Sequence, residues 1–239
     1  NVVKEGGNII VLSDRQFGKD RIALPALLAI ASVHHHLIRK GLRTAVGLVV
    51  ESAEPREVHH FAVLAGYGAE AINPYMAFDT ILDLKQKNML SKDVSETEAV
   101  SRYIKSVNKG LLKVMSKMGI STYQSYCGAQ IFDAVGLSEE FVSKYFKGTS
   151  TQISGVGINE IAKETITRHE EAYSNLEVLR DSLDVGGDYA VRKRGEVHAW
   201  SSDEITNLQH AVRSNSFDTF KEYSRSMDEQ EERLFTIRG

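Results

Sequence analysis

Three consecutive histidines, His34 to His36, could bind a metal ion, because neutral imidazole is a common metal ligand. Consecutive side chains on a helix, however, point about 100° apart and do not converge on one ion. The pair His59 and His60, with Glu57 nearby, has the same geometry, although histidines from different segments could still meet in space. We therefore expect these histidines to serve in packing or at an interface, and we predict no metal site.

The chain has one cysteine, Cys127, so it can form neither an intrachain disulfide nor a metal site of several cysteines. No histidine is adjacent to Cys127 in sequence, and nucleophilic use would require a partner from another segment. We predict a buried, unreactive thiol in a reducing compartment. Gly155-Val-Gly157 and Gly186-Gly187 are too short for a dinucleotide-binding fingerprint and predict turns. The residues by themselves thus predict no catalytic group and no cofactor-binding motif.

A different set of polar residues follows the predicted strands, at the points where each strand ends. In parallel α/β folds ligands bind at the carboxyl ends of the strands, so these residues are expected to converge on one rim. Two interpretations stay open: the rim binds a ligand, or its side chains only cap the following helices and pair with one another. The candidate rim residues are Asp14, Arg15, Glu51, Asn73, Gln124 and Ser125.

The elements that position this rim alternate between strands and helices. Short apolar runs predict strands, and amphipathic stretches that end near Gly41 and Gly66 predict helices. This order predicts an α/β fold with a partial, barrel-like parallel sheet and surrounding helices. The predicted strands are 8–12, 44–50 and 69–72, with extended segments at 120–126 and 129–135, and the predicted helices are 26–40, 54–64, 75–85 and 97–118.

The C-terminal part of the chain is predicted to be mainly helical, over 159–175, from Ser202 or Asp203 to Val212, and over 216–233. Within it, Leu183 to Gly195 contains two adjacent glycines and five charged residues. This composition indicates a turn-rich hinge and a domain boundary.

Composition excludes several classes of function. The 239 residues are 42% hydrophobic and 26% charged, which is typical of a folded globular protein. A net charge of -3, with both signs mixed along the chain, gives no footprint for nucleic acid or an anionic membrane. The apolar stretch Ile22–Ile38 is interrupted by Pro25 and the histidines and does not predict a membrane span.

The start at Asn1 without a methionine, and a strand-like end at Gly239, indicate a piece of a longer chain.

Nine long and unusual segments occur in a fixed order over nearly the whole chain. They are Ala31–Ile38, Val46–Glu51, Arg56–Phe61, Gly66–Pro74, Lys109–Thr122, Gln124–Tyr126, Gly128–Phe132, Gly195–Trp200 and Leu234–Gly239. In this order they resemble the central region of the glutamate synthase large subunit. The resemblance implies that residues 1–185 are the C-terminal part of the central domain, and that residues 186–239 are a hinge and lead-in to the FMN-binding domain.

The family resemblance also implies a reaction. Such an enzyme transfers the amide nitrogen of glutamine to 2-oxoglutarate and reduces the product to give two glutamates. An amidotransferase domain with a cysteine nucleophile, the central domain, and an FMN barrel with a 3Fe-4S cluster would cooperate. The FMN and cluster motifs are expected outside this chain, and the rim residues would line a route for ammonia between the reaction sites.

The piece by itself is then expected to be an inactive scaffold without a bound cofactor. Its expected partners are the amidotransferase and FMN domains of the same chain, and a small reductase subunit or ferredoxin, in the cytoplasm or a plastid. No nucleic acid or membrane partner is expected. The alternative is a stand-alone α/β domain or enzyme that binds a small molecule with the polar rim residues.

Overall fold

The computed structural model describes residues 2–174 and 198–229. The chain divides into two compact units, Asn1–Tyr173 and Ser174–Gly239, and each is described here by itself. The hinge expected at 183–195, which includes Gly186-Gly187 and the basic run Arg192–Arg194, lies outside the described residues, as does the segment Leu234–Gly239.

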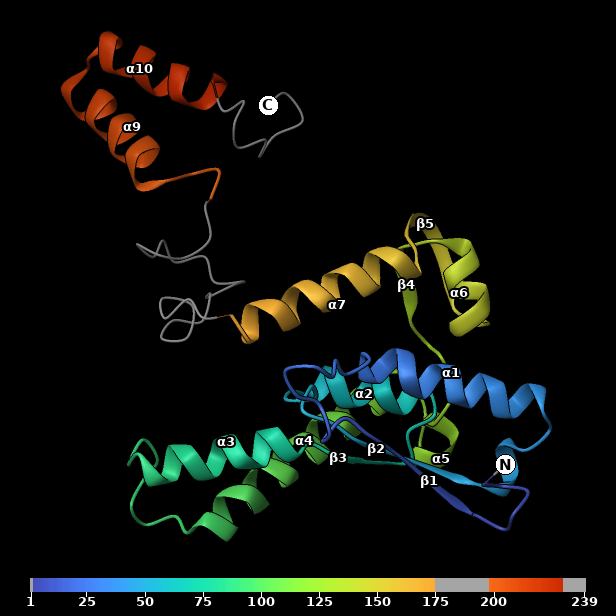
Figure 1. Ribbon diagram of the computed structural model, residues 1–239. Coiled ribbons are helices and arrows are strands. Elements are labelled where there is room, and N and C mark those ends of the chain that lie inside the picture. Colours follow the sequence, from blue (N-terminus) through green and yellow to red (C-terminus); the bar gives the residue numbers. More distant parts are fainter. Residues whose placement is uncertain (1, 175–197, 230–239) are drawn as a thin grey trace. The chain divides into compact units, whose positions relative to one another are not determined.

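The first unit contains a three-stranded parallel sheet, as the sequence predicts (Figure 1). Its order is β1-β2-β3, and the register places Ser13, Glu51 and Asn73 side by side at the carboxyl ends of the strands. Helices α1 and α2 make the connections between successive strands. The bounds are β1 Ile9–Ser13, α1 Ala26–Arg39, β2 Gly47–Glu51, α2 Val58–Gly66 and β3 Ala71–Asn73.

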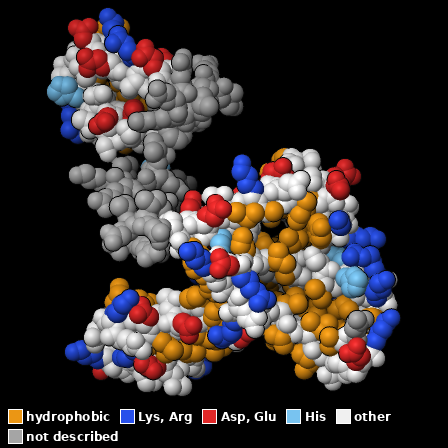
Figure 2. All heavy atoms as spheres, in the orientation of Figure 1, with side chains coloured by type: hydrophobic (Ala, Val, Ile, Leu, Met, Phe, Trp, Pro, Cys, Tyr) orange, Lys and Arg blue, Asp and Glu red, His pale blue; other side chains and the backbone are white. Residues whose placement is uncertain are grey.

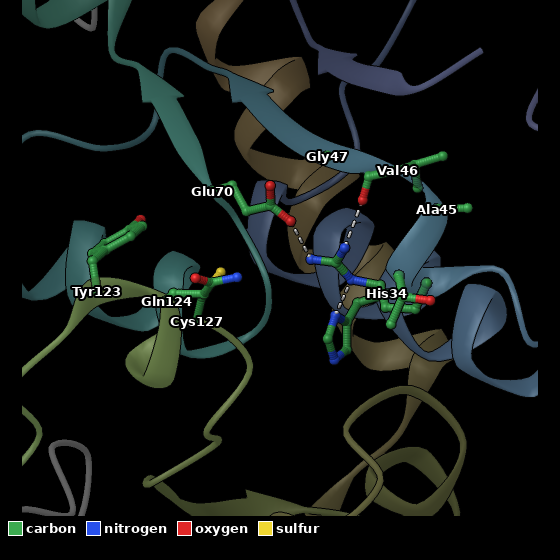
Figure 3. Close-up of a pocket in the computed structure, with 10 residues that line it drawn as sticks. His34, Ala45, Val46, Gly47, Glu70, Tyr123, Gln124 and Cys127 are labelled. Carbon is green, nitrogen blue, oxygen red and sulfur yellow. Dashed lines mark hydrogen bonds and ion pairs between the residues drawn. The ribbon is translucent and has the colours of Figure 1, made fainter. Parts of the chain in front are cut away.

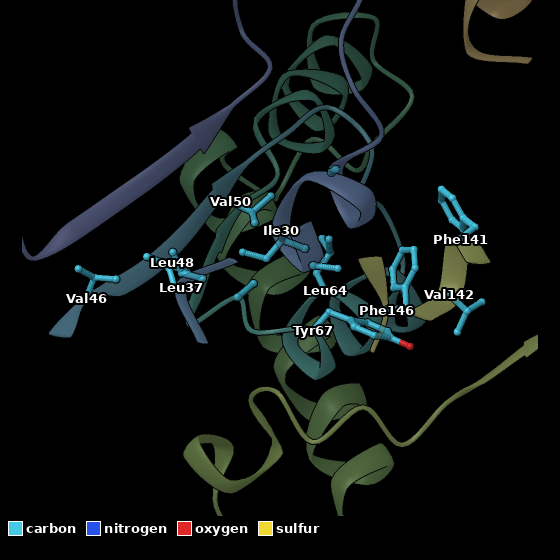
Figure 4. Close-up of a cluster of buried hydrophobic side chains, with 13 residues drawn as sticks. Ile30, Leu37, Val46, Leu48, Val50, Leu64, Tyr67, Phe141, Val142 and Phe146 are labelled. Atoms are coloured by element: carbon cyan, nitrogen blue, oxygen red, sulfur yellow. The ribbon is translucent and has the colours of Figure 1, made fainter. Parts of the chain in front are cut away.

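The main hydrophobic core lies on one face of this sheet (Figure 4). Leu48 and Val50 are two residues apart on β2 and therefore lie on the same face of the sheet. They pack in one cluster with Ile30 of α1 and Leu64 of α2. All four side chains are almost fully buried. Full burial of such a side chain contributes about 1.5–3 kcal/mol, so the cluster accounts for much of what holds the helices to the sheet.

The opposite face of the sheet carries the other set of alternating side chains. Ile9 and Val11 of β1 are 61% and 56% exposed, and the register aligns Val11 with Val49 and Ala71. We call this surface, bearing Ile9, Val11, Val49 and Ala71 with Ser13, Glu51 and Asn73 at its end, the open face. Over the described residues the sheet does not close, so the barrel expected from the sequence is not confirmed. Three strands are too few for closure, which takes about eight.

Two helices follow β3, namely α3 Tyr75–Gln86 and α4 Glu96–Lys117. The Ser95 hydroxyl accepts a hydrogen bond from the Glu98 amide, which confirms the predicted start of α4. The segment 120–126, however, was expected to be extended, and the structure forms the short helix α5, Tyr123–Tyr126. Thr122 caps this helix by accepting from the Ser125 amide, and the Tyr126 ring is completely buried. Aromatic residues that favour strands therefore serve here as core side chains of a helical turn.

A second, two-stranded parallel sheet comprises β4 Asp133–Leu137 and β5 Ser150–Val156, connected by α6 Glu139–Tyr145. β4 lies later than the expected segment 129–135, and the sequence analysis missed α6 and β5. Gly136, with a φ of +75°, and Gly155, whose Cα faces the Gly136 carbonyl, lie where the two strands approach closely and the register shifts. The turn predicted at Gly155 is therefore wrong, because this glycine lies within β5 at an irregularity of the sheet. Helix α7, Ile158–Ala172, then ends the unit.

The described part of the second unit is a pair of contacting helices, α9 Ser202–Ser214 and α10 Phe217–Asp228. Asn215 makes the turn in the left-handed conformation, with a φ of 53°. The predicted helical character is confirmed. Figure 2 shows hydrophobic side chains reaching the surface of the first unit in several places. In the described ranges, no helix combines the length and apolar character needed to cross a bilayer.

Candidate functional site

The Asp14 carboxylate organises the carboxyl-end rim of the three-stranded sheet. It accepts hydrogen bonds of 2.6 Å from the hydroxyls of Ser52 and Tyr75 and one of 3.0 Å from the Ala53 amide. Ser52 and Tyr75 are only 1% and 5% exposed. The Ser52 hydroxyl oxygen also accepts a hydrogen bond from the Glu54 amide. One network of hydrogen bonds therefore links the segments that follow all three strands. Charge-assisted bonds of this length are among the stronger hydrogen bonds in proteins.

Glu51 is the second centre of the rim and lies on the open face. Its carboxylate accepts from the Ser13 hydroxyl at 2.6 Å, from the Arg15 Nε at 2.7 Å and from the Asn73 amide at 3.1 Å. The guanidinium of Arg15 also lies 4.1 Å from the centre of the Tyr75 ring, which joins the two centres. Asp14, Arg15, Glu51 and Asn73 are thus brought together, as predicted.

These contacts determine the protonation states of the rim. Hydrogen bonds from Ser13 and Arg15 lower the pKa of Glu51, so its carboxylate stays ionised at neutral pH. Burial, followed by the hydrogen bond to Asp14, raises the pKa of Tyr75 above its ordinary value, and the phenol stays protonated. A cavity of about 430 Å³ borders the rim at Ser13, Asp14 and Glu51. The rim groups pair with one another, and the binding of a ligand at the rim stays a prediction.

Gln124 and Ser125 lie elsewhere, and the expectation that they share the rim is wrong. They belong to helix α5 rather than to a strand, and Gln124 lines a cavity of about 680 Å³ together with Val46 and Gly47 at the amino end of β2. The Ser125 hydroxyl accepts a hydrogen bond of 2.8 Å from Thr122. The role of these two residues in a channel stays a prediction.

Arg43 anchors the wall of this second cavity (Figure 3). Its guanidinium donates to the His34 Nδ1 at 2.9 Å, to the carbonyls of Val46 and Gly68 at 2.8 and 3.1 Å, and to the Glu70 carboxylate at 2.9 Å. Four of its five N–H groups are therefore used. The Arg43 side chain is 17% exposed, and it ties the segments before β2 and β3 to helix α1.

His34 is the neutral acceptor in this arrangement. Burial, followed by the positive charge of Arg43, lowers its pKa to about 4, and because Nδ1 accepts from Arg43 the ring proton is on Nε2. His35 points to a different partner, with its Nε2 at 3.1 Å from the Gln130 amide nitrogen. His34 and His35 are buried, which confirms their predicted packing role. Within the described ranges, no group of histidines, cysteines and carboxylates has the geometry of a metal site.

Cys127 lies at the edge of the same cavity. Its thiol donates to the Ala69 carbonyl at a sulfur to oxygen distance of 3.4 Å, and burial raises its pKa to about 11. Thiolate is the reactive form of cysteine, so the raised pKa disfavours reaction at neutral pH. Cys127 is only partly buried, so the predicted burial holds in part, and the lack of reactivity stays a prediction.

Two residues central to these networks, Arg43 and Tyr75, are not among the residues that the sequence predicts for the rim. Tyr75 lies two residues after Asn73, a predicted rim residue, so its position is a usable signal. Arg43 gives no such signal, since its partners include Gly68 and Glu70, which lie 25 and 27 residues away in sequence.

A comparison with family models gives one match, described as the glutamate synthase central domain, over residues 1–138. The matched range contains both networks and the whole three-stranded sheet. The chain belongs to the glutamate synthase central-domain family. Seven of the nine long segments found in the sequence lie within the matched range.

Glutamate synthases from distant organisms are similar to almost all of this chain. The NADPH glutamate synthase large chain of Bacillus subtilis is 47% identical over 95% of this chain and 15% of its own length. The NADH glutamate synthase of Schizosaccharomyces pombe is 42% identical over 99% and 11%. The ferredoxin-dependent glutamate synthase of Pyropia yezoensis is 42% identical over 92% and 15%. The chain thus spans less than a sixth of the length of these relatives.

Proposed function

We propose that this chain is a scaffold within a glutamate synthase, and that the open face of its sheet forms part of the wall of an ammonia route. The whole enzyme would convert glutamine, 2-oxoglutarate, two electrons and two protons to two glutamates. The amide nitrogen released in one domain would travel to the carbonyl carbon of 2-oxoglutarate in another. This chain would position those domains and exclude water, and it would perform no step of the chemistry.

The observation that carries the proposal is the mutual pairing of the rim groups. Asp14 and Glu51 accept their hydrogen bonds from side chains and amides of the chain itself, and neither is presented as a free base. A route for a small neutral molecule requires packed walls and the exclusion of water more than it requires acid-base groups. The open face offers apolar Ile9, Val11 and Val49 next to this closed polar rim.

The residues of this chain do not fit a 3Fe-4S cluster. Such clusters are held by several cysteine thiolates, whereas the chain contains one cysteine. The raised pKa of Cys127 and its hydrogen bond to Ala69 further disfavour ligation. We therefore assign the cluster, and the FMN expected with it, to other parts of the enzyme.

The partners proposed for this chain are the amidotransferase and FMN domains of the same polypeptide, with a small reductase subunit or ferredoxin as the electron donor. Relatives named for NADPH, NADH and ferredoxin are all similar to the chain. Their shared similarity supports a role common to all three, such as a scaffold. We propose the cytoplasm or a plastid as the compartment, because a reducing environment suits the unpaired thiol of Cys127.

A direct experiment is to assay the 239-residue chain alone with glutamine, 2-oxoglutarate and a chemical reductant. The proposal predicts neither glutamate formation nor glutamine hydrolysis above the background rate, in a sample whose circular dichroism shows a folded protein. Titration of the same sample with glutamine and 2-oxoglutarate addresses the alternative function. Saturable binding that Glu51→Gln abolishes would favour a small-molecule site at the rim and would contradict the scaffold role.

A further inference from the structure

A cavity of about 510 Å³ in the first unit belongs neither to the rim network nor to the His34 network. It lies between helix α7 and the segments that follow strands β1 and β2. The His169 Nε2 donates a hydrogen bond of 2.9 Å to the Lys19 carbonyl, which holds α7 against the segment after β1. The volume falls in the range of ordinary small-molecule sites, about 300–1,000 Å³.

Two arginines line this cavity, Arg56 before helix α2 and Arg168 on α7. Arg56 forms its hydrogen bonds through its main chain, with His60 and Tyr103. Neither guanidinium forms an ion pair or donates a hydrogen bond to any residue in the described part of the chain. In Arg15 and Arg43, by contrast, the guanidinium binds a carboxylate at 2.7 and 2.9 Å.

One carboxylate, that of Glu54, lies in the same cavity. It accepts a hydrogen bond of 3.0 Å from the Ala26 amide at the start of α1. Arg168 attracts it electrostatically without a direct contact, and partial loss of hydration is the main cause that raises the pKa of Glu54. Two guanidinium charges and one carboxylate leave the cavity with a surplus of one positive charge, which an anion would neutralise.

The remaining lining residues suit the body of an organic anion. Phe17, Ile22 and Pro25 offer an apolar surface. Thr165 of α7 also lines the cavity, and since its hydroxyl donates to the Ile161 carbonyl at 2.8 Å, its oxygen can accept only from a donor on the body of the ligand, such as a hydroxyl. Planar guanidinium groups bind carboxylate and phosphate oxygens in pairs, with a geometry that an ammonium group does not match.

We propose that this cavity binds a small organic anion whose carboxylate or phosphate group lies between Arg56 and Arg168. The inference is independent of the scaffold function proposed above, because neither arginine belongs to the open face or the rim. The anion would cross-link α7 to the segment before α2 and stabilise the first unit against unfolding.

Isothermal titration of the full 239-residue chain with malonate and, separately, with inorganic phosphate tests this site, with sodium chloride at equal ionic strength as the reference. We expect one saturable site for at least one of the two probes. Arg56→Gln and Arg168→Gln should each weaken binding about tenfold, since each removes one charge-assisted pair of guanidinium hydrogen bonds to the anion. Arg102→Gln is the matched control, because Arg102 lies on α4 and pairs with Glu98, and its affinity should equal that of the unchanged protein.

Binding of malonate alone would identify a carboxylate site, and binding of phosphate alone a phosphate site, and either result supports the proposal. Circular dichroism and thermal unfolding establish that each variant is folded. Arg168→Lys keeps the positive charge but loses the planar, paired N–H groups of the guanidinium. We expect it to weaken binding less than Arg168→Gln does. The proposal is overturned if neither probe saturates a site below 20 mM, about the weakest affinity of interest. Equal affinities of the folded Gln variants and the unchanged protein would also overturn it.

Discussion

The Tyr75 hydroxyl donates a hydrogen bond of 2.6 Å to the Asp14 carboxylate and thereby ties the start of helix α3 to the end of strand β1. Ser52 donates to the same carboxylate from the end of β2. The partly buried Asp14 carboxylate therefore joins the segments that follow all three strands of the sheet. Since each donor is fixed in position by the fold, we interpret Asp14 as a structural residue of the rim.

Removal of the Tyr75 hydroxyl tests this interpretation. Tyr75→Phe should lower the free energy of unfolding by about 1.5–3 kcal/mol, because it deletes a hydrogen bond to a charged acceptor at a site that is only 5% exposed. Tyr103→Phe is the control, since the Tyr103 hydroxyl donates to the neutral Arg56 carbonyl, and we expect a loss of about 0.5–1 kcal/mol. Urea denaturation measures both, and equal losses for the two variants would contradict a special role for Asp14.

A second prediction concerns the close approach of His34 to Gly68. Gly68 has a φ of +108°, and a Cβ there would collide with the His34 ring, whereas Gly41, with a φ of +67°, faces open space. Gly41→Ala should cost only the backbone strain, about 1 kcal/mol. Gly68→Ala should cost about 2–3 kcal/mol more, since it must displace the buried His34 from Arg43. Thermal unfolding in which the two variants lose the same stability would refute this packing.

His34 contributes to the pH dependence of stability, because burial lowers its pKa from 6.5 to about 4 in the folded chain. Burial also lowers the pKa of His35, which adds a change of the same sign. The unfolded chain binds this proton first as the pH falls, so His34 favours unfolding progressively below pH 6.5. The loss between pH 6.5 and pH 5 should be about 1.5 kcal/mol from this residue. His34→Asn, which keeps an acceptor for Arg43, should flatten the stability curve over this interval. His36→Asn, at an exposed position of the same helix, should leave the curve unchanged, and a curve that His34→Asn does not flatten would argue against a neutral buried ring.

Cys127 provides a chemical prediction. With a pKa of about 11, its thiolate fraction at pH 8 is about one in a thousand. Alkylation by iodoacetamide should therefore be about a hundredfold slower than that of free cysteine, and should accelerate with each unit of pH up to about 11. Mass spectrometry of the intact protein gives the rate, and the same protein in urea serves as the reference. Alkylation at the rate of free cysteine in the folded protein would show that the thiol is neither buried nor bonded to Ala69.

Much of the first sheet could be predicted because its signals are local. Short apolar runs in β1, β2 and β3 alternate with helices α1 and α2, which are followed closely by Gly41 and Gly68, and the strand ends then follow by topology. The grouping of Asp14, Glu51 and Asn73 followed from the rule that parallel strands end on the same side.

The second sheet and the Arg43 network could not be predicted, because they depend on long-range contacts. Gly136 and Gly155 are adjacent only once β4 and β5 pair, and in the sequence they resemble turn residues. Arg43 contacts segments separated from it by up to 27 residues. Gln124 was misplaced because the segment around it has strand-forming residues, whereas the burial of Tyr126 and the Thr122 cap favour a helical turn.

The most direct test of the scaffold proposal uses the glutamate synthase to which that proposal assigns this chain, and it follows the amide nitrogen of glutamine. With amide-labelled glutamine, one measures the share of label that enters glutamate and the share released as free ammonium. Val11→Asn makes the open face polar, and Val135→Asn makes the same change at another exposed strand position, 69% exposed, on β4. We predict that Val11→Asn raises the free ammonium share several-fold while glutamine hydrolysis continues, and that Val135→Asn leaves the share unchanged. An unchanged share in Val11→Asn, at full activity, would contradict the assignment of the open face to the ammonia route.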